Sequence, residues 1–349
     1  MRAVDGPKNG FVLPFDKDRH KGRQVRQVVA AVIRIVQKDH VAGKNPTVKV
    51  IHHRFHGEGQ AANVQRDMFP AGVVNVIADR NDLGGMLSSH PDVAKVTFTG
   101  STATGKKVMS AASSTLKRIT LELGGNDAAI ILDDADMETV SQQVFDAAFN
   151  LSGQVCTAVK RVYVPRANYD DVCDKIAIIA KTAKIGSGLD EDTKIGPVQN
   201  PMQIEKVKGF LDIAARDGTV IAGGNVMDAQ GYFIEPTIVR DIDPNSDLVE
   251  EEQFGPVLPI LPYDDLESVI STVNNSEYGL GSSVWSADTT KATEVALQLD
   301  AGSIWVNRHG YIDPAAPFAG AKQSGIGIEM GMEGLKEFTQ MQLLVVEKG

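Results

Sequence analysis

Short apolar segments with strand character alternate with helix-like segments from about Pro70 to the end of the chain. Strands are predicted over residues 72–78, 95–99, 118–123, 128–132, 161–164, 233–239, 255–261, 281–285, 303–307 and 342–347, and helices over 79–89, 101–110, 137–151 and 169–183. Strands that alternate with helices predict parallel sheets covered by helices on both faces. The sequence therefore predicts an α/β fold, and its 349 residues suit two doubly wound parallel-sheet domains.

Composition narrows the class of function. A net charge of -10 argues against non-specific binding to nucleic acid. No apolar run is long enough to span a bilayer, and the N-terminus lacks a compact apolar signal segment, so we expect neither a membrane nor a secreted protein. Two cysteines make no disulfide framework, which fits a cytoplasmic protein.

The stretch up to about Arg66 differs in composition from the rest. It is rich in Lys and Arg and holds five of the seven histidines, and an apolar face predicts a helix over residues 23–37. His52, His53 and His56 with Glu58 could supply metal ligands. Glycines on both sides of Glu58 argue against the helix that would gather them, so we expect no metal site.

A glycine-rich turn follows the strand predicted at residues 95–99. Gly100 and Gly105 bracket the turn, and Ser101 follows the first of them. Glycine lets a backbone approach a phosphate, and the next helix N-terminus offers free N–H groups. The spacing is not the usual dinucleotide fingerprint, so an ordinary strand–helix turn with a capping serine explains it equally well.

Glu122 ends the strand predicted at residues 118–123, directly before Gly124 and Gly125. Parallel sheets bind ligands at the carboxyl ends of their strands, where a carboxylate can activate water as a general base. An acid at a solvated strand end is the alternative.

Cys156 lies in a glycine-softened segment, Gly153-Gln-Val-Cys-Thr157. A nucleophilic thiol needs a polar, partly exposed setting, and a buried inert thiol is the alternative for an isolated cysteine. Cys173 lies on the apolar side of a predicted helix and fits the inert description.

The segment Glu251-Glu-Gln-Phe-Gly-Pro-Val257 combines acids, an aromatic ring and a turn. Glu252 could bind ribose hydroxyls while Phe254 packs near a nicotinamide. An acidic loop that leads into a strand is the alternative.

Taken together and in this order, these segments resemble the aldehyde dehydrogenase superfamily. The resemblance rests on PAGVVNVI, HPDVAKVTFTGSTATG, LELGGN, GQVCTAVKRVYVP, IGPVQNP, EEQFGPVLPI, NNSEYGL, GSIWVN and PFAGAKQSGIG. It implies oxidation of a small-molecule aldehyde to an acid with NAD or NADP as cofactor. It also implies a Rossmann-like cofactor domain over residues 1–124, a catalytic domain over 125–322, and a last segment, 323–349, that returns to the cofactor domain and carries a C-terminal oligomerisation strand.

The resemblance also implies roles for single residues. Cys156 matches the nucleophile that forms a thiohemiacetal and then a thioester, and Glu122 matches the base that activates water for hydrolysis. The positions that match the family's cofactor-binding residues are Gly100, Ser101, Gly105, Leu123, Glu252 and Phe254. Asn307 matches a structural position.

The chain departs from the family pattern at its N-terminal side. No Pro-Trp-Asn turn, which carries the oxyanion asparagine, occurs anywhere, and Asn126 stands where lysine is usual. The lysine segment that holds the adenine ribose in the family is reduced to a remnant around Lys49, and NAD is distinguished from NADP near that segment. The hairpin that pairs with a neighbouring subunit is missing. We therefore predict an N-terminally truncated and divergent member, with the homo-oligomer typical of the family in doubt.

Two other functions follow from these departures. A catalytically inactive aldehyde dehydrogenase-like protein, which keeps the fold without turnover, is the main alternative. An acyl-phosphate reductase of the same superfamily needs no water-activating base, so the presence of Glu122 disfavours it.

Overall fold

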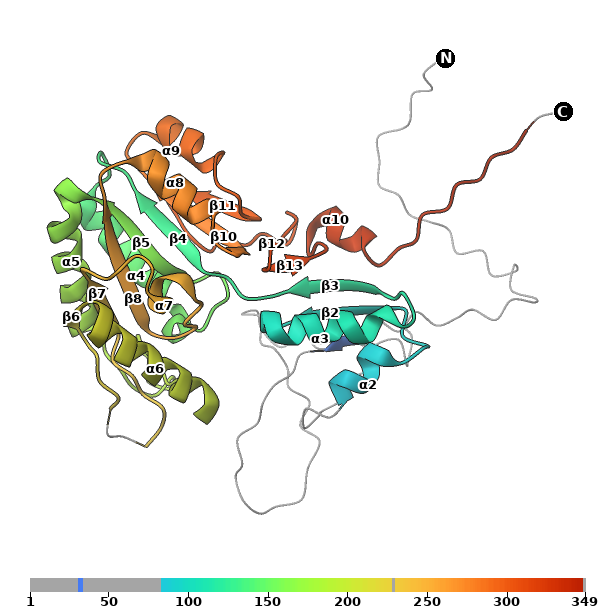
Figure 1. Ribbon diagram of the computed structural model, residues 1–349, viewed down its shortest axis with the longest axis horizontal. Coiled ribbons are helices and arrows are strands. Elements are labelled where there is room, and N and C mark those ends of the chain that lie inside the picture. Colours follow the sequence, from blue (N-terminus) through green and yellow to red (C-terminus); the bar gives the residue numbers. More distant parts are fainter. Residues whose placement is uncertain (1–30, 34–82, 228–229, 348–349) are drawn as a thin grey trace.

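The computed structural model describes residues 31–33, 83–227 and 230–347 of the chain. These residues form a four-stranded sheet, a seven-stranded sheet and a two-stranded ribbon, with helices packed on the two larger sheets (Figure 1). The two sheets lie in separate lobes, and the chain passes from one to the other after β3 (Figure 1). The predicted α/β class is confirmed.

The small sheet has the strand order β1-β2-β3-β13. Its strands are β1 (Ala31–Ile33), β2 (Lys95–Thr99), β3 (Arg118–Glu122) and β13 (Gly325–Ile326), and α2 (Leu83–Ser89) and α3 (Thr102–Ser113) accompany it. The first three strands are parallel, whereas β13 pairs with β3 antiparallel. The chain thus re-enters the small sheet near its end. The domain boundaries at residues 124 and 322 stay a prediction.

The prediction of a helix over residues 23–37 is wrong for residues 31–33, the part of that range that the structure describes. Residues 31–33 form β1, which pairs in parallel with β2 from Val96 to Phe98. Pairing with a neighbouring strand therefore outweighs the helical spacing of the apolar residues here. The rest of that range, the histidine-rich stretch and the strand predicted at 72–78 lie outside the described residues.

The large sheet has the strand order β11-β10-β4-β5-β8-β7-β6 and is parallel except at its β6–β7 edge. The strands are β4 (Asp127–Ile131), β5 (Val159–Pro165), β6 (Thr219–Ala222), β7 (Thr237–Arg240), β8 (Val257–Tyr263), β10 (Gly281–Trp285) and β11 (Ser303–Val306). The ribbon pairs β9 (Tyr278–Gly279) with β12 (Ala321–Lys322), next to β13.

Helices cover both faces of the large sheet, which explains the unbroken apolar runs of its strands. Along β4, Ala129 and Ile131 join the core under α4 (Met137–Phe149) and α5 (Tyr169–Thr182). Ala128 and Ile130 join the opposite core. That core also takes side chains from α6 (Pro201–Asp217), α7 (Asp247–Glu250), α8 (Leu266–Asn274) and α9 (Thr289–Ala296). Among the described residues there are also the short helices η1 (Asn150–Gly153), η2 (Arg166–Asn168) and α10 (Gly331–Lys336).

Residues 342–347, predicted as a strand, do not pair with any strand among the described residues. Residues 340–347 make no β-ladder, and Met341 and the run Leu343–Val346 are each exposed by 74% or more. A strand needs a hydrogen-bonded neighbour, and none of the described residues supplies one. The tail is therefore an extended apolar segment (Figure 1).

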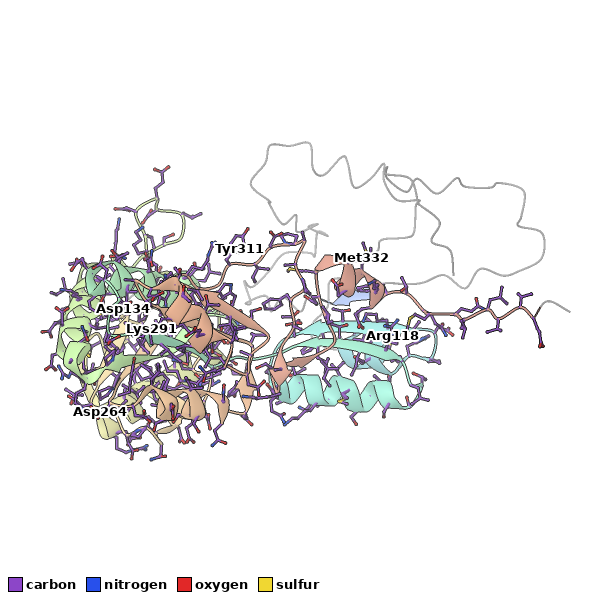
Figure 2. The ribbon with its side chains drawn as sticks, turned by 90° about the horizontal axis from the view of Figure 1, so that it is seen from above. Arg118, Asp134, Asp264, Lys291, Tyr311 and Met332 are labelled. Carbon is purple, nitrogen blue, oxygen red and sulfur yellow. The ribbon has the colours of Figure 1, made fainter. Side chains whose placement is uncertain are left out.

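The exterior of the large lobe carries paired charges. Lys291 lies 2.6 Å from Asp133, and Arg166 makes a two-pronged pair with Asp264. Figure 2 shows Lys291 and Asp264 on that lobe, and Arg118 on the lobe of the small sheet. Within the described ranges, no helix combines the length and apolar character needed to cross a bilayer.

Candidate active site

Cys156 follows a tightly wound turn between α4 and β5. Leu151, Ser152 and Gly153 have φ values of 49°, 60° and 72°, three consecutive residues in the left-handed region. A Cβ on Gly153 would lie 2.4 Å from the carbonyl oxygen of Gly255, so only glycine fits there. Such backbone persists only where its surroundings impose it. The turn places Cys156 at an intermediate exposure, in contrast to Cys173.

Lys160 holds the backbone around Cys156 in place. Its Nζ donates to the carbonyl oxygens of Val155, Cys156 and Ala158 at 3.0, 2.7 and 3.3 Å. The side chain is 2% exposed, and its ammonium lies 3.7 Å from Oε1 of Glu252. One buried cation therefore binds three backbone carbonyls and lies beside a carboxylate.

The setting of the Cys156 thiol contains opposing electrostatic effects. Burial is the largest and raises its pKa, and the carboxylates of Asp127 and Glu252 act in the same direction. The Lys160 ammonium and the Thr157 N–H lower the pKa. Cys173 lies fully buried in the core under α5, and burial raises its pKa to about 12, as expected of an inert thiol.

Glu252 meets the glycine pair that follows Glu122. Its Oε1 accepts a 3.1 Å hydrogen bond from the N–H of Gly125, and a Cβ on Gly124 would lie 2.4 Å from its Oε2. A Cβ on Gly125 would lie 2.7 Å from the carbonyl oxygen of Cys156. The structure thus brings Glu252, Gly125 and Cys156 together although they are far apart in sequence. Burial raises the pKa of Glu252, and Lys160 opposes this.

The backbone beside Glu252 is fixed by side chains from α6. Phe254 has a φ of 48°, and its carbonyl accepts a hydrogen bond from Gln203, which also binds the carbonyl of Gln253. Lys206 donates to the carbonyl of Glu252 at 2.7 Å. This anchoring directs the Glu252 side chain to Gly125.

Glu122 ends β3 inside the protein. It is 4% exposed, and neither carboxylate oxygen has a hydrogen-bond partner among the described residues. Burial, followed by the negative charge of Glu329, raises its pKa to about 8. The alternative of a solvated strand-end acid is therefore wrong, and Glu122 is a carboxyl group that holds its proton near neutral pH.

The glycine-rich turn lies directly beside Glu122. The N–H of Gly100 donates to the carbonyl of Glu122 at 3.0 Å, and Ser101 caps α3 by accepting from the N–H of Thr104. A Cβ on Gly105 would lie 2.5 Å from Cδ2 of Leu123, so this glycine lets α3 pack on the sheet. Leu123 is a core residue. Gly100 and Ser101 are exposed at the start of α3.

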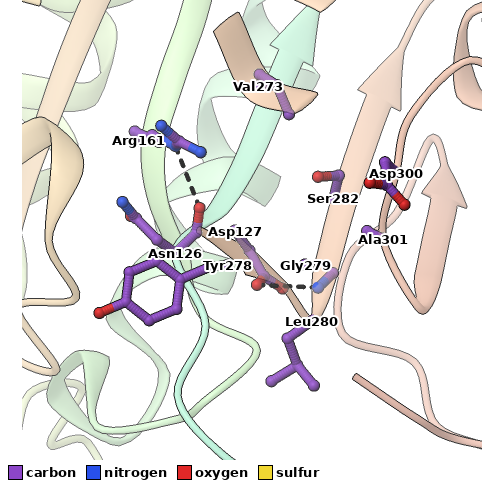
Figure 3. Close-up of a pocket in the computed structure, with 11 residues that line it drawn as sticks. Asn126, Asp127, Arg161, Val273, Tyr278, Gly279, Leu280, Ser282, Asp300 and Ala301 are labelled. Atoms are coloured by element: carbon purple, nitrogen blue, oxygen red, sulfur yellow. Dashed lines mark hydrogen bonds between the residues drawn. The ribbon is translucent and has the colours of Figure 1, made fainter. Parts of the chain in front are cut away.

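Three residues that sequence reasoning did not assign to the site contribute to it. Lys160 is one, and its charge within an apolar strand was the available signal. Asn126 donates to the carbonyls of Val249 and Glu250 and so anchors the segment before Glu252. Asp127 accepts from the N–H of Gly281 at 3.1 Å, beside a pocket of about 10 Å³ (Figure 3).

Other predicted features have structural roles. Asn307 exchanges two hydrogen bonds with the backbone of Ser286, in agreement with the structural position predicted for it.

A hollow of about 450 Å³ lies at the carboxyl ends of β4, β5 and β8. The charged side chains that line this hollow form ion pairs with one another, so the hollow presents no unpaired charge to a ligand. Within the described ranges, no group of three or more His, Cys, Asp or Glu residues could hold a metal ion.

Comparison with known proteins gives one consistent result. The model of the aldehyde dehydrogenase family matches residues 60–344. The chain is similar to phenylacetaldehyde dehydrogenase of Pseudomonas fluorescens, with 39% identity over 281 residues that cover 79% of this chain and 56% of the relative. It is also similar to betaine aldehyde dehydrogenase of Rhizobium etli, with 37% identity over 284 residues, 80% of this chain and 58% of the relative.

Solved structures agree. The NAD+ complex of aldehyde dehydrogenase from Bacillus cereus has a TM-score of 0.76 and 40% identity, and covers 79% of this chain and 57% of that one. The Mycobacterium tuberculosis aldehyde dehydrogenase complexed with NAD+ has a TM-score of 0.76 and 36% identity, with the same coverage. The chain thus spans somewhat more than half the length of these relatives. By sequence and by fold, it belongs to the aldehyde dehydrogenase family.

Proposed function

We propose that this protein oxidises an aldehyde to a carboxylic acid with NAD+ or NADP+, through a covalent intermediate on Cys156. The observation that carries the proposal is the contrast between the two cysteines. Cys173 is inert in a core, whereas Cys156 lies partly exposed on a constrained turn, where burial raises the pKa of its thiol and the Lys160 ammonium opposes this rise. Family membership supports the same chemistry.

The described residues fit a dinucleotide. Gly100 and Ser101 are exposed at the N-terminus of the 12-residue helix α3, where N–H groups and the helix dipole favour a phosphate. Glu252 presents a carboxylate at Gly124 and Gly125, which a ribose hydroxyl could bind. When bound, NAD+ or NADP+ supplies the hydride acceptor. The two nucleotides are not distinguished by these residues.

The proposed steps use Cys156 first and Glu122 second. The Cys156 thiolate adds to the aldehyde carbon and forms the oxyanion of a thiohemiacetal. A dinucleotide held beside Gly100, Ser101 and Glu252 would accept the hydride of that carbon as the oxyanion collapses, which would leave a thioester on Cys156. Glu122, in its ionised form, takes a proton from water, the resulting hydroxide attacks the thioester carbon, and the Cys156 thiolate leaves as the carboxylic acid forms.

A burst experiment tests both assignments. The protein is mixed with NAD+ or NADP+ and a panel of aldehydes that includes phenylacetaldehyde and betaine aldehyde, because similar proteins are named for these substrates. Wild type should form reduced nucleotide continuously. Glu122→Gln should form about one equivalent per site and then stop, because the thioester is not hydrolysed. Cys156→Ser should give no burst, and Cys173→Ala, the matched thiol control, should behave like wild type.

Two results would contradict the proposal. Equal rates for wild type and Cys156→Ser would exclude the thiol mechanism. No reduced nucleotide with any aldehyde, together with normal alkylation of Cys156 by iodoacetamide, would instead favour the catalytically inactive dehydrogenase-like protein.

A further inference from the structure

A buried histidine, His309, contacts the segment that carries Cys156. His309 follows β11, and its side chain is 1% exposed. Its Nε2 lies 2.7 Å from the carbonyl oxygen of Thr157, and its Nδ1 lies 2.9 Å from Oγ of Ser283 on β10. The ring of Trp305 packs against the imidazole, with 4.8 Å between ring centroids. The imidazole therefore has one defined orientation.

The hydrogen-bond partners assign the proton on this ring. A carbonyl oxygen only accepts, so Nε2 carries the hydrogen that it donates to Thr157. Ser283 Oγ accepts from Nε1 of Trp285 at 3.0 Å, which leaves the serine hydroxyl hydrogen free to donate to Nδ1 of His309. A directed chain of donors thus runs from Trp285 through Ser283 and His309 to Thr157.

Asp127 supports the same arrangement. Its Oδ2 is buried, lies 3.5 Å from Nε2 of His309, and has no hydrogen-bond partner among the described residues. Its other oxygen is held by the N–H of Gly281, at the start of β10 (Figure 3). A negative charge this close to Nε2 also favours the hydrogen on that nitrogen.

Thr157 connects this chain to the thiol. Its carbonyl accepts from His309, and it directly follows Cys156 in the chain, where its N–H is among the groups that lower the pKa of the thiol. The residue is 4% exposed. Anchoring its carbonyl therefore fixes the backbone directly after Cys156.

We infer that His309 is a positioning residue for the nucleophile: it holds the Thr157 backbone directly after Cys156 and so fixes where the Cys156 thiolate lies. The inference rests on the proposed function, in which that thiolate attacks the aldehyde. His309 itself takes no part in the proton transfers of the reaction.

The test measures the Cys156 thiol directly. Iodoacetamide alkylation of the full chain is followed from pH 6 to pH 10 by mass spectrometry of the Cys156 peptide. His309→Leu removes the donor to Thr157, whereas His309→Gln replaces it with an amide N–H. His90→Gln, on an exposed histidine of the small lobe, is the matched control.

The two substitutions at His309 should have different effects on the alkylation of Cys156. For His309→Leu, the alkylation profile should move to higher pH and the rate at pH 7.5 should fall about tenfold, the effect of one buried hydrogen bond. His309→Gln should stay within about threefold of wild type, because it restores that bond. His90→Gln should be unchanged. A merely structural role for His309 would leave the pH profile of correctly folded variants in place.

The other possible results also decide whether the inference holds. An unchanged profile for His309→Leu, or equal losses for His309→Leu and His309→Gln, overturns the inference. If His309→Leu does not fold, Ser283→Ala removes the bond that orients the ring and should slow alkylation in the same direction, and an unchanged rate then overturns the inference. A wild type that forms no reduced nucleotide, but shows the His309→Leu defect in alkylation, overturns the proposed function and leaves the role of His309 in place.

Discussion

The stability of the protein should depend on pH through the single carboxyl group of Glu122. Burial and Glu329 raise its pKa from the usual 4.5 to about 8. In the unfolded chain the group is in water and releases its proton near pH 4.5. Between these two values the folded state therefore binds more protons than the unfolded state, and the free energy of unfolding must fall as pH rises.

The size of the effect follows from the two pKa values. Each pKa unit corresponds to about 1.4 kcal/mol, and the slope flattens as pH approaches 8 and the folded carboxyl ionises. From pH 6 to pH 8 the loss amounts to roughly 2 kcal/mol. Glu122→Gln carries no titrating group at this position, so the loss should be absent from the variant. Below pH 4.5 both states are protonated, and this contribution no longer varies with pH.

Urea unfolding of wild type and Glu122→Gln at pH 6, 7 and 8 measures the difference. The free energy of unfolding of the variant, relative to wild type, should rise by roughly 2 kcal/mol over this range. Glu294→Gln, on the exposed face of α9, is the control and should show a constant difference. A difference for Glu122→Gln that does not change with pH would show that the carboxyl is solvated, and the account of its raised pKa would fail.

Two further predictions concern the Cys156 segment. Lys160→Met removes the donor to three carbonyls and leaves Glu252 without its buried cation, so the free energy of unfolding should fall by about 3 kcal/mol, and a wild-type urea midpoint would refute this. Gly125→Ala introduces a Cβ 2.7 Å from the Cys156 carbonyl oxygen. It should cost about 1–3 kcal/mol of stability and lower the rate at which reduced nucleotide forms, and unchanged thermal melting together with an unchanged rate would contradict this.

Local sequence determined much of the fold. The strands β2, β3, β4, β5, β8, β10 and β11 form near their predicted positions, as do α3, α4 and α5. Their apolar periods and glycine ends are local signals that secondary structure follows directly. α6, α8 and α9 were not predicted, although each contributes apolar side chains to a core of the large sheet. The tail was predicted as a terminal strand, and a strand forms only with a neighbour.

For the candidate site, the sequence by itself determined which groups are present: a thiol on a glycine-softened turn, an acid at a strand end, and a glycine-rich turn before a helix. Only the tertiary structure decided what surrounds them. Gly125 and Glu252 are 127 residues apart and Thr157 and His309 are 152 apart, yet both pairs are hydrogen-bonded. The reactivity of a thiol or a carboxyl depends on burial and on charges within a few ångströms, and packing brings those neighbours from distant parts of the chain. No local pattern encodes them.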